Sequence, residues 1–237
     1  MTFRSVKALL VFAISLAAAL PASADHHKKE GKSLFDGKTL AGWQGNPKLW
    51  RVEDGAITGE STDDAPLKHN EFLIWDGEVG DFVLKLKFRI EGRGVQNSGI
   101  QYRSQRHPDV GKYVVGGYQA DIDGKGQYMG ILYEERGRGI LALQGQDVVL
   151  LKGDDGVEKK VVGTLGEKSE LLAGTEPGEW HDYQVEAKGR DLTHVINGRT
   201  IVKVVDRDDA FRAKGLLALQ LHAGPAMKVQ FKEIRLS

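Results

Sequence analysis

The sequence predicts an all-β protein folded as a sandwich of antiparallel sheets. From residue 33 onward, runs of roughly five to eight residues alternate between apolar and polar side chains, and Gly, Asp or Asn separates each run from the next. No long stretch spaces its apolar residues at helical intervals, and only 168–173 indicates a short helical turn. Because no repeat or Pro/Ser-rich linker divides the chain, we expect 33–237 to form one domain.

The first residues have the composition of a secretory signal peptide. Arg4 and Lys7 precede an uncharged apolar stretch at 8–20, and the small residues of a cleavage site follow at 22–24. We therefore expect 1–24 to be removed on export and 25–32 to form a flexible polar leader. The apolar stretch is shorter than the ~20 residues of a membrane span. The sequence thus predicts a periplasmic or secreted protein without a membrane span.

Charge and cysteine content exclude several kinds of site. Lys and Arg together number 33, as do Asp and Glu, and no basic cluster occurs. Proteins that bind nucleic acid need surplus positive charge for the phosphates, so we expect no nucleic-acid partner. The chain has no cysteine, which excludes disulfide bonds, thiolate nucleophiles and cysteine-bound zinc. The stability of the fold therefore depends on its hydrophobic core.

Residues 82–90 form the clearest single strand. Apolar side chains at the even positions alternate with Val83 and three cationic residues at the odd positions, so one face is expected to be buried. The Gly- and Asp-rich segments 76–81, 123–127 and 152–157 are predicted to be loops that connect strands.

Three further strands each carry hydrogen-bonding side chains on one face. These are Gln101 and Arg103 in 99–103, Gln119, Asp121 and Asp123 in 118–123, and Gln220 and His222 in 217–222. Because side chains alternate along a strand, the groups share one face if the strands lie in one sheet. The simpler interpretation is the solvated side of a half-buried sheet. Residue type favours a binding face, since Gln, Arg, Asp and His make the directional contacts that hydroxyl-rich ligands require.

The segment 130–137 contains two adjacent carboxylates beside an arginine. Such a cluster can supply a general acid or base with a shifted pKa. In a regular strand Glu134 and Glu135 point to opposite faces, so at most one of them enters a cleft. The other is expected to form an ion pair with Arg136 or Arg138.

The strongest turn signal lies in the C-terminal third. Residues 192–196 run into Asn197-Gly198, and the alternating segment 199–205 follows. Asn-Gly supplies the two positive φ angles of a type I′ turn. We therefore predict an antiparallel hairpin over these segments.

Several motifs, taken in order, resemble the 3-keto-disaccharide hydrolase family. They are Ser33-Leu34-Phe35-Asp36-Gly37-Lys38-Thr39-Leu40 with Gly42-Trp43, Trp50-Arg51-Val52-Glu53-Asp54-Gly55-Ala56-Ile57, Asn97-Ser98-Gly99-Ile100, Gly117-Tyr118-Gln119, Gly178-Glu179-Trp180-His181, and the segments 215–222 and 229–236. The resemblance covers essentially all of the chain after the leader. It implies a concanavalin A-like jelly-roll β-sandwich of two curved antiparallel sheets, with sugars bound on a concave outer face.

The resemblance also implies cleavage of glycosides whose pyranose ring carries a ketone at C3. The ketone acidifies the hydrogen on C2, so a base can remove it, the C1 substituent can leave by elimination, and water can add back. The substrate would be an oligosaccharide or glycoside, and a sugar 3-dehydrogenase would act upstream. The catalytic candidates are Asp121 or Glu134 as base, Arg103 and His222 at the enolate oxygen, and Glu135 as acid. The substrate-binding candidates are Gln101, Gln119, Tyr133, Arg136 and Gln220.

Three alternatives stay open at this point. A divalent cation held by Asp121, Glu134 and His222 would polarise the ketone, although no ligand spacing demands it. An ordinary glycoside hydrolase would use two carboxyl groups about 5 to 9.5 Å apart. A non-catalytic carbohydrate-binding module would stack sugars on tryptophan side chains. The four tryptophans, however, are expected in the core or at sheet edges: Trp43, Trp50, Trp75 and Trp180.

Overall fold

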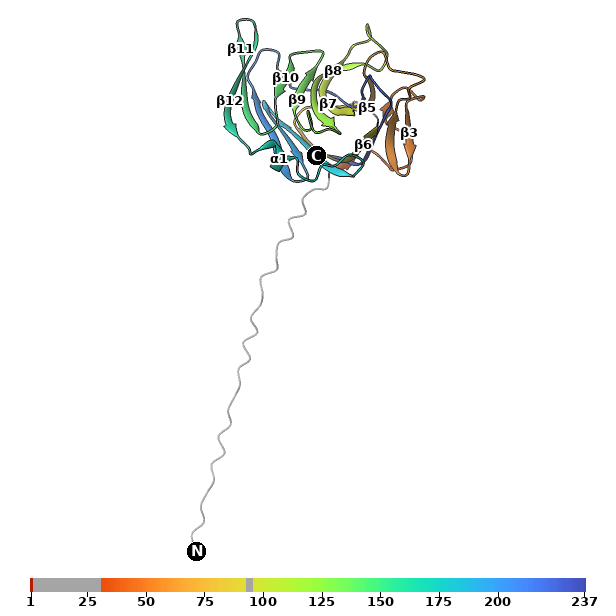
Figure 1. The fold of residues 1–237 in the computed structure, drawn as a ribbon. Helices are drawn as coiled ribbons and strands as arrows, with labels where there is room; N and C mark the ends of the chain where they lie inside the picture. Colours follow the sequence, from red (N-terminus) through yellow and green to blue (C-terminus); the bar gives the residue numbers. More distant parts are fainter. Residues whose placement is uncertain (2–30, 93–95) are drawn as a thin grey trace.

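The computed structural model describes Met1 and residues 31–92 and 96–237. Two β-sheets pack face to face in this part of the chain (Figure 1). This architecture confirms the predicted all-β sandwich. The expected signal peptide and most of the leader lie outside the described residues, so export stays a prediction. Lys32, the last residue of the expected leader, already pairs with Leu236 in a strand.

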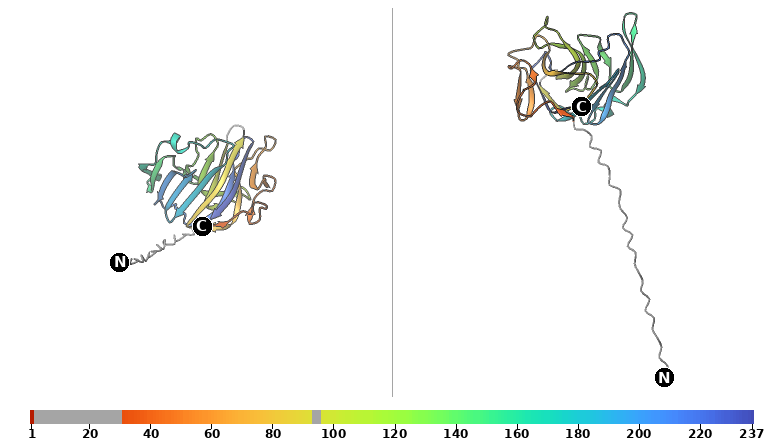
Figure 2. Two further views of the ribbon diagram at one scale, coloured as in Figure 1. Left: turned by 90° about the horizontal axis from the view of Figure 1, so that it is seen from below. Right: turned by 180° about the vertical axis from the view of Figure 1, so that it is seen from behind.

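The larger sheet has ten strands. They are β1 (Lys32–Ser33), β3 (Trp50–Glu53), β4 (Ala56–Glu60), β6 (Phe82–Gly92), β11 (Gln146–Gly153), β12 (Gly156–Thr164), β13 (His181–Lys188), β14 (Asp191–Ile196), β15 (Arg199–Asp206) and β17 (Met227–Leu236). Their order is β12-β11-β15-β14-β13-β6-β17-β4-β3, with β1 paired to β17 (Figure 2). All pairs are antiparallel except β11 with β15, a parallel pair that the sequence did not predict.

The smaller sheet has seven strands, all paired antiparallel. They are β2 (Trp43–Gln44), β5 (Glu71–Val79), β7 (Asn97–Arg106), β8 (Val115–Asp123), β9 (Leu132–Glu135), β10 (Gly139–Ala142) and β16 (Gly215–Leu221), in the order β10-β9-β8-β7-β16-β5-β2. The expected helical turn is α1 (Lys168–Leu171). Among the described residues, no helix is both long and apolar enough to cross a membrane.

The main core lies between the two sheets. The even-numbered residues of β6 from Phe82 to Ile90 are buried there, as the alternation predicts, in one core cluster with Tyr102 and Tyr118 of the smaller sheet. Phe82 contacts Tyr102 edge to face at 5.8 Å between ring centroids. Each fully buried side chain of this size contributes roughly 1.5–3 kcal/mol. The core therefore holds the smaller sheet in a fixed position over the larger one.

The structure confirms the C-terminal hairpin. Asn197 and Gly198 have φ angles of 47° and 77°, and Ile196 pairs with Arg199 across the turn. The Asn197 side chain donates a hydrogen bond to Gly174 O at 3.1 Å and accepts one from the Asp182 amide at 2.9 Å. These two hydrogen bonds connect the turn to Gly174 and to Asp182 near the start of β13.

Two of the predicted loops are shorter than expected. Strand β5 continues to Val79, so only Gly80 and Asp81 connect it to β6. The charged residues Asp76 and Glu78 suggested a loop, but both side chains point to solvent, so they fit in a strand. Similarly, only 154–155 separate β11 from β12. The turn at 123–127 follows β8 as predicted.

Candidate active site

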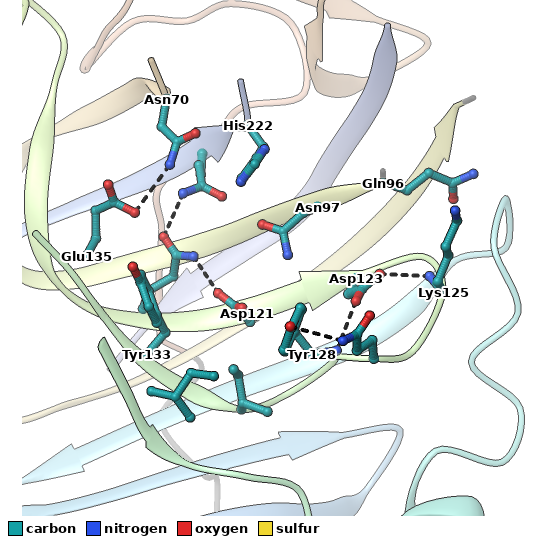
Figure 3. Close-up of a pocket in the computed structure, with 15 residues that line it drawn as sticks. Asn70, Gln96, Asn97, Asp121, Asp123, Lys125, Tyr128, Tyr133, Glu135 and His222 are labelled. Atoms are coloured by element: carbon teal, nitrogen blue, oxygen red, sulfur yellow. Dashed lines mark hydrogen bonds between the residues drawn. The ribbon is translucent and has the colours of Figure 1, made fainter. Parts of the chain in front are cut away.

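A cavity of about 580 Å³ lies on the outer face of the smaller sheet (Figure 3). In β8, Tyr118 and Ala120 point into the core, while Gln119 and Asp121 point outward into this cavity. Its lining residues are Asn70, Gln96, Asn97, Gln119, Asp121, Asp123, Lys125, Gln127, Tyr128, Ile131, Tyr133, Glu135, Ile140, Gln220 and His222. Strands β8, β9 and β16 therefore bring several predicted site residues together on one face.

The glutamines of three neighbouring strands meet below the cavity. Gln119 Oε1 accepts hydrogen bonds from Gln101 Nε2 at 2.6 Å and from Gln220 Nε2 at 2.8 Å. Gln119 Nε2 in turn donates to Asp121 Oδ1. All four side chains are almost fully buried. The polar groups on this face therefore form an ordered network rather than a solvated sheet surface.

Asp121 is the most strongly perturbed acid in the cavity. Burial raises its pKa to about 8, and the negative charges of Asp123 and Glu135 act in the same direction. Hydrogen bonds from Gln119 and Asn97 oppose this shift by stabilising the carboxylate. At neutral pH the Asp121 carboxyl is therefore mainly protonated, and it can donate a proton or a hydrogen bond.

Three other side chains that line the cavity also have shifted pKa values. Burial raises the pKa of Glu135, against the opposing effects of Arg136 and a 3.2 Å hydrogen bond from Asn70 Nδ2. Burial also raises the pKa of Tyr133. The pKa of His222 is lowered, again by burial. His222 Nδ1 lies 2.5 Å from Ala223 O, which can only accept, so Nδ1 carries the hydrogen and Nε2 retains its lone pair.

The structure places Arg103 away from this cavity, contrary to expectation. Arg103 has a φ angle of 48°, and the β7–β8 register shifts between Tyr102 and Gln105. This bulge turns the Arg103 side chain off the face that Gln101 occupies. Its guanidinium instead donates to the carbonyl oxygens of Gly80, Gly189 and Arg212 at 2.9, 2.8 and 3.2 Å. Arg103 therefore connects loops and cannot reach the enolate oxygen of a ligand in the cavity.

Glu134 also lies outside the cavity. As strand parity predicts, it points to the face opposite Glu135, and Arg138 Nε donates to its Oε2 at 2.5 Å. Arg138 continues to Asp206 at 2.7 Å and Asp208 at 3.2 Å, so these groups form a buried ion-pair network. The structure therefore does not place Glu134 in the cavity with Asp121.

The structure does not bring together the three side chains of the alternative cation site, Asp121, Glu134 and His222, because Glu134 faces away from the cavity that the other two line. Within the part of the chain that the structure describes, no group of three His, Asp or Glu side chains is arranged to hold a metal ion. Arg136 lies just beyond the cavity, where its Nε is 4.0 Å from Glu135 Oε1. The positive charge of Arg136 opposes the rise in the pKa of Glu135, and so affects the cavity without lining it.

The chain matches the model of the 3-keto-alpha-glucoside-1,2-lyase-like domain over residues 30–237. The chain belongs to this family. This membership confirms the resemblance inferred from the sequence motifs.

One named relative of this lyase-like domain matches only part of the chain. A Bacteroides thetaiotaomicron protein named 3-keto-disaccharide hydrolase is 33% identical over 93 residues, which cover 36% of this chain. The match spans only 30% of that protein's length.

Three solved structures share the fold of the lyase-like domain. A Parabacteroides distasonis protein provisionally named a glycosyl hydrolase has a TM-score of 0.56 at 16% identity, covering 87% of this chain and 98% of its own. The carbohydrate-binding module CBM66 from Bacillus subtilis has a TM-score of 0.52 at 16% identity, covering 83% and 95%. A Bacillus subtilis protein described as having a galectin-like fold has a TM-score of 0.51 at 10% identity, covering 82% and 88%. These similarities support the jelly-roll sandwich.

Sequence reasoning missed several residues that line the cavity of this lyase-like domain. Asn97 pairs with Asp123 at the end of β7 and β8, so extending the strand alternation by one residue pair would have found it. Its partner Asp123, which the alternation did place on this face, accepts hydrogen bonds from the amides of Lys125 and Tyr128 at 2.8 and 2.9 Å, and so shapes the turn at the cavity rim. Asn70 precedes β5 and carries no periodic signal. Only the tertiary fold brings it to Glu135.

Proposed function

We propose that this protein is a carbohydrate-active enzyme that cleaves 3-keto-glycosides by elimination followed by addition of water. Membership of a family described as 3-keto-alpha-glucoside-1,2-lyase-like supports this substrate, as does the name of the Bacteroides thetaiotaomicron relative. A cavity of about 580 Å³ lies within the size range of small-molecule sites. An upstream enzyme that oxidises the C3 hydroxyl, such as a sugar 3-dehydrogenase, would have to supply the substrate.

The reaction requires a base at C2 and a hydrogen-bond donor at the C3 oxygen. Removal of the C2 proton produces an enolate whose negative charge rests on that oxygen. When the ketone re-forms, the electron pair makes a C1–C2 double bond and the C1–O bond breaks, so the aglycone leaves as an alcohol after protonation. Water then adds its hydroxyl to C1 and a hydrogen to C2.

Two groups in the cavity have the protonation states that this chemistry needs. His222 is neutral with an unprotonated Nε2, so we assign it as the base at C2. Asp121 is mainly protonated, so we assign it as the donor to the enolate oxygen rather than as the base. Glu135, whose pKa is also raised, is the candidate acid for the leaving oxygen. The observation that carries the proposal is this neutral acid and neutral base in one cavity.

An assay with matched substrates tests the proposal. The purified protein is incubated with a 3-keto-disaccharide or with its unoxidised parent, with and without a chelator, and sugar release is followed. We expect release from the keto substrate only, and a loss of about 10²–10⁴-fold in kcat for His222→Gln. The chelator arm tests whether a divalent cation takes part. Release from the unoxidised disaccharide alone would exclude the keto-glycoside proposal.

An ordinary glycoside hydrolase is the second candidate function. The observation that favours it is that Asp121 and Glu135 both face the cavity, one with a raised pKa of about 8. A module that stacks sugars on tryptophan has less support. None of the four tryptophans lines the cavity, and Trp43 and Trp50 are buried in the core. Binding of sugars without turnover of either disaccharide would favour the module.

A further inference from the structure

A chain of side-chain hydrogen bonds reaches Asp121 from outside the cavity. It begins at Ser104, a buried residue that does not line the cavity. Ser104 Oγ lies 2.7 Å from Gln101 Oε1 and 3.3 Å from Tyr102 O, so its single hydrogen is directed mainly to the glutamine. Gln101 then donates to Gln119, and Gln119 donates to Asp121 Oδ1. We call Ser104, Gln101 and Gln119 the amide relay.

The donors and acceptors give the amide relay a fixed direction. Because Gln101 Oε1 accepts from Ser104, the NH₂ group of Gln101 faces Gln119. Gln119 Oε1 accepts from both Gln101 and Gln220, so only its NH₂ group is left to face Asp121. Turning any one amide over would bring two acceptors or two donors together in a buried site, which costs roughly 1–3 kcal/mol per unsatisfied group.

Two glycines leave the space that the amide relay occupies. A Cβ atom on Gly99 would lie 2.6 Å from Gln119 Cδ, and one on Gly117 would lie 2.7 Å from Ser104 Oγ. Real Cβ atoms do not make such contacts. The lack of a side chain at Gly99 and Gly117 therefore leaves room for Gln119 at one end of the amide relay and for Ser104 at the other.

We propose that Ser104, Gln101 and Gln119 are positioning residues that hold Asp121 Oδ1 as a hydrogen-bond acceptor and so fix the orientation of the Asp121 carboxyl group in the cavity. Because the Gln119 amide can present only its NH₂ group to Oδ1, the carboxyl plane is set by a donor whose own direction is fixed by Gln101 and Ser104. A carboxyl held in this way presents its proton to the substrate oxygen in one orientation. The catalytic meaning of this inference rests on the proposed function, whereas its structural meaning does not.

The first test removes the start of the amide relay. Ser104→Ala leaves the Gln101 amide without its orienting donor, so we expect kcat to fall about tenfold with KM within twofold. The limb of the pH profile at about pH 8, which reports Asp121, should shift as well. Ser61→Ala removes another buried serine hydroxyl, which bonds to the Met227 amide and neither belongs to the relay nor lines the cavity, and it is the matched control. Equal kcat and pH profiles for Ser104→Ala and the wild type would overturn the proposal.

The second test displaces the Gln119 amide without deleting it. Gly99→Ala pushes a methyl group against Gln119, so it should reproduce the kcat loss of Gln119→Leu. Gly80→Ala is the control, because a Cβ there meets no atom closer than 3.7 Å. Normal kcat in Gly99→Ala would contradict the need for the amide.

A third measurement does not depend on activity. In protein labelled with ¹⁵N-glutamine, Ser104→Ala should shift the side-chain amide signals of Gln101 and Gln119, while that of Gln184, on the larger sheet, stays in place. Unchanged Gln119 signals would overturn the relay even in an active enzyme. If the wild type cleaves no 3-keto-glycoside, the proposed function fails, and the NMR result still decides whether the relay exists.

Discussion

Glu134 and Glu135 are adjacent in the sequence, yet their carboxylates lie on opposite faces of β9. Glu134 faces inward and accepts a hydrogen bond from Arg138, whereas Glu135 faces the cavity and accepts one from Asn70. The surroundings of the two side chains also differ, because Glu134 belongs to a buried ion-pair network and Glu135 lines a cavity of ligand size. One residue therefore stabilises the fold and the other is available for chemistry.

We predict that substituting Glu134 affects mainly stability, whereas substituting Glu135 affects mainly activity. Glu134→Gln leaves the buried Arg138 short of one partner, so it should lower the free energy of unfolding by about 3 kcal/mol, measured by urea denaturation. Glu135→Gln should change that free energy by less than about 1 kcal/mol but reduce kcat on the 3-keto substrate. The reverse pattern would show that the two roles are exchanged.

Arg103 gives a second prediction. Arg103→Met leaves three carbonyl oxygens without their donor, so it should cost about 3 kcal/mol of unfolding free energy, with kcat and KM within twofold of the wild type. Arg51→Met, at an exposed ion pair, is the control and should cost less than about 1 kcal/mol. A kcat loss without a stability loss would return Arg103 to the catalytic candidates.

The raised pKa of Asp121 predicts a pH-dependent stability difference. Its folded-state pKa of about 8 exceeds the ordinary value of 3.8, so its stabilising contribution is complete below pH 3.8 and is lost as pH rises through about 8. Asp121→Asn cannot ionise. Relative to the wild type, this variant should therefore gain at least about 1 kcal/mol between pH 6 and pH 8. Thermal unfolding across this range checks it, with Asp64→Asn as an exposed control that should show no such gain.

The pH dependence of kcat/KM follows from the same cavity. Activity should fall on the acid side as His222 becomes protonated, at a pKa below its ordinary 6.5, and on the alkaline side above about pH 8 as Asp121 ionises. In Asp121→Asn the alkaline limb should disappear, whereas His107→Gln, outside the cavity, should retain both limbs. A wild-type profile without an alkaline limb would argue against Asp121 as the donor.

Much of the site could be predicted from strand alternation. Gln119 and Asp121 in β8 and Gln220 in β16 share the outer face because side chains alternate with a period of two residues, which the sequence shows directly. The same rule separated Glu134 from Glu135. It failed at Arg103, where a bulge shifts the register and the alternation breaks.

The sequence by itself determined the sandwich, the Asn197-Gly198 turn and the face on which each regular strand presents its polar groups, because these depend on local alternation and turn chemistry. Only the tertiary structure decided the location of the bulge, the approach of Asn70 to Glu135 and the neutral state of Asp121. The physical reason is that burial and charge act through space, and the groups that desolvate or polarise a side chain come from segments far apart in the chain.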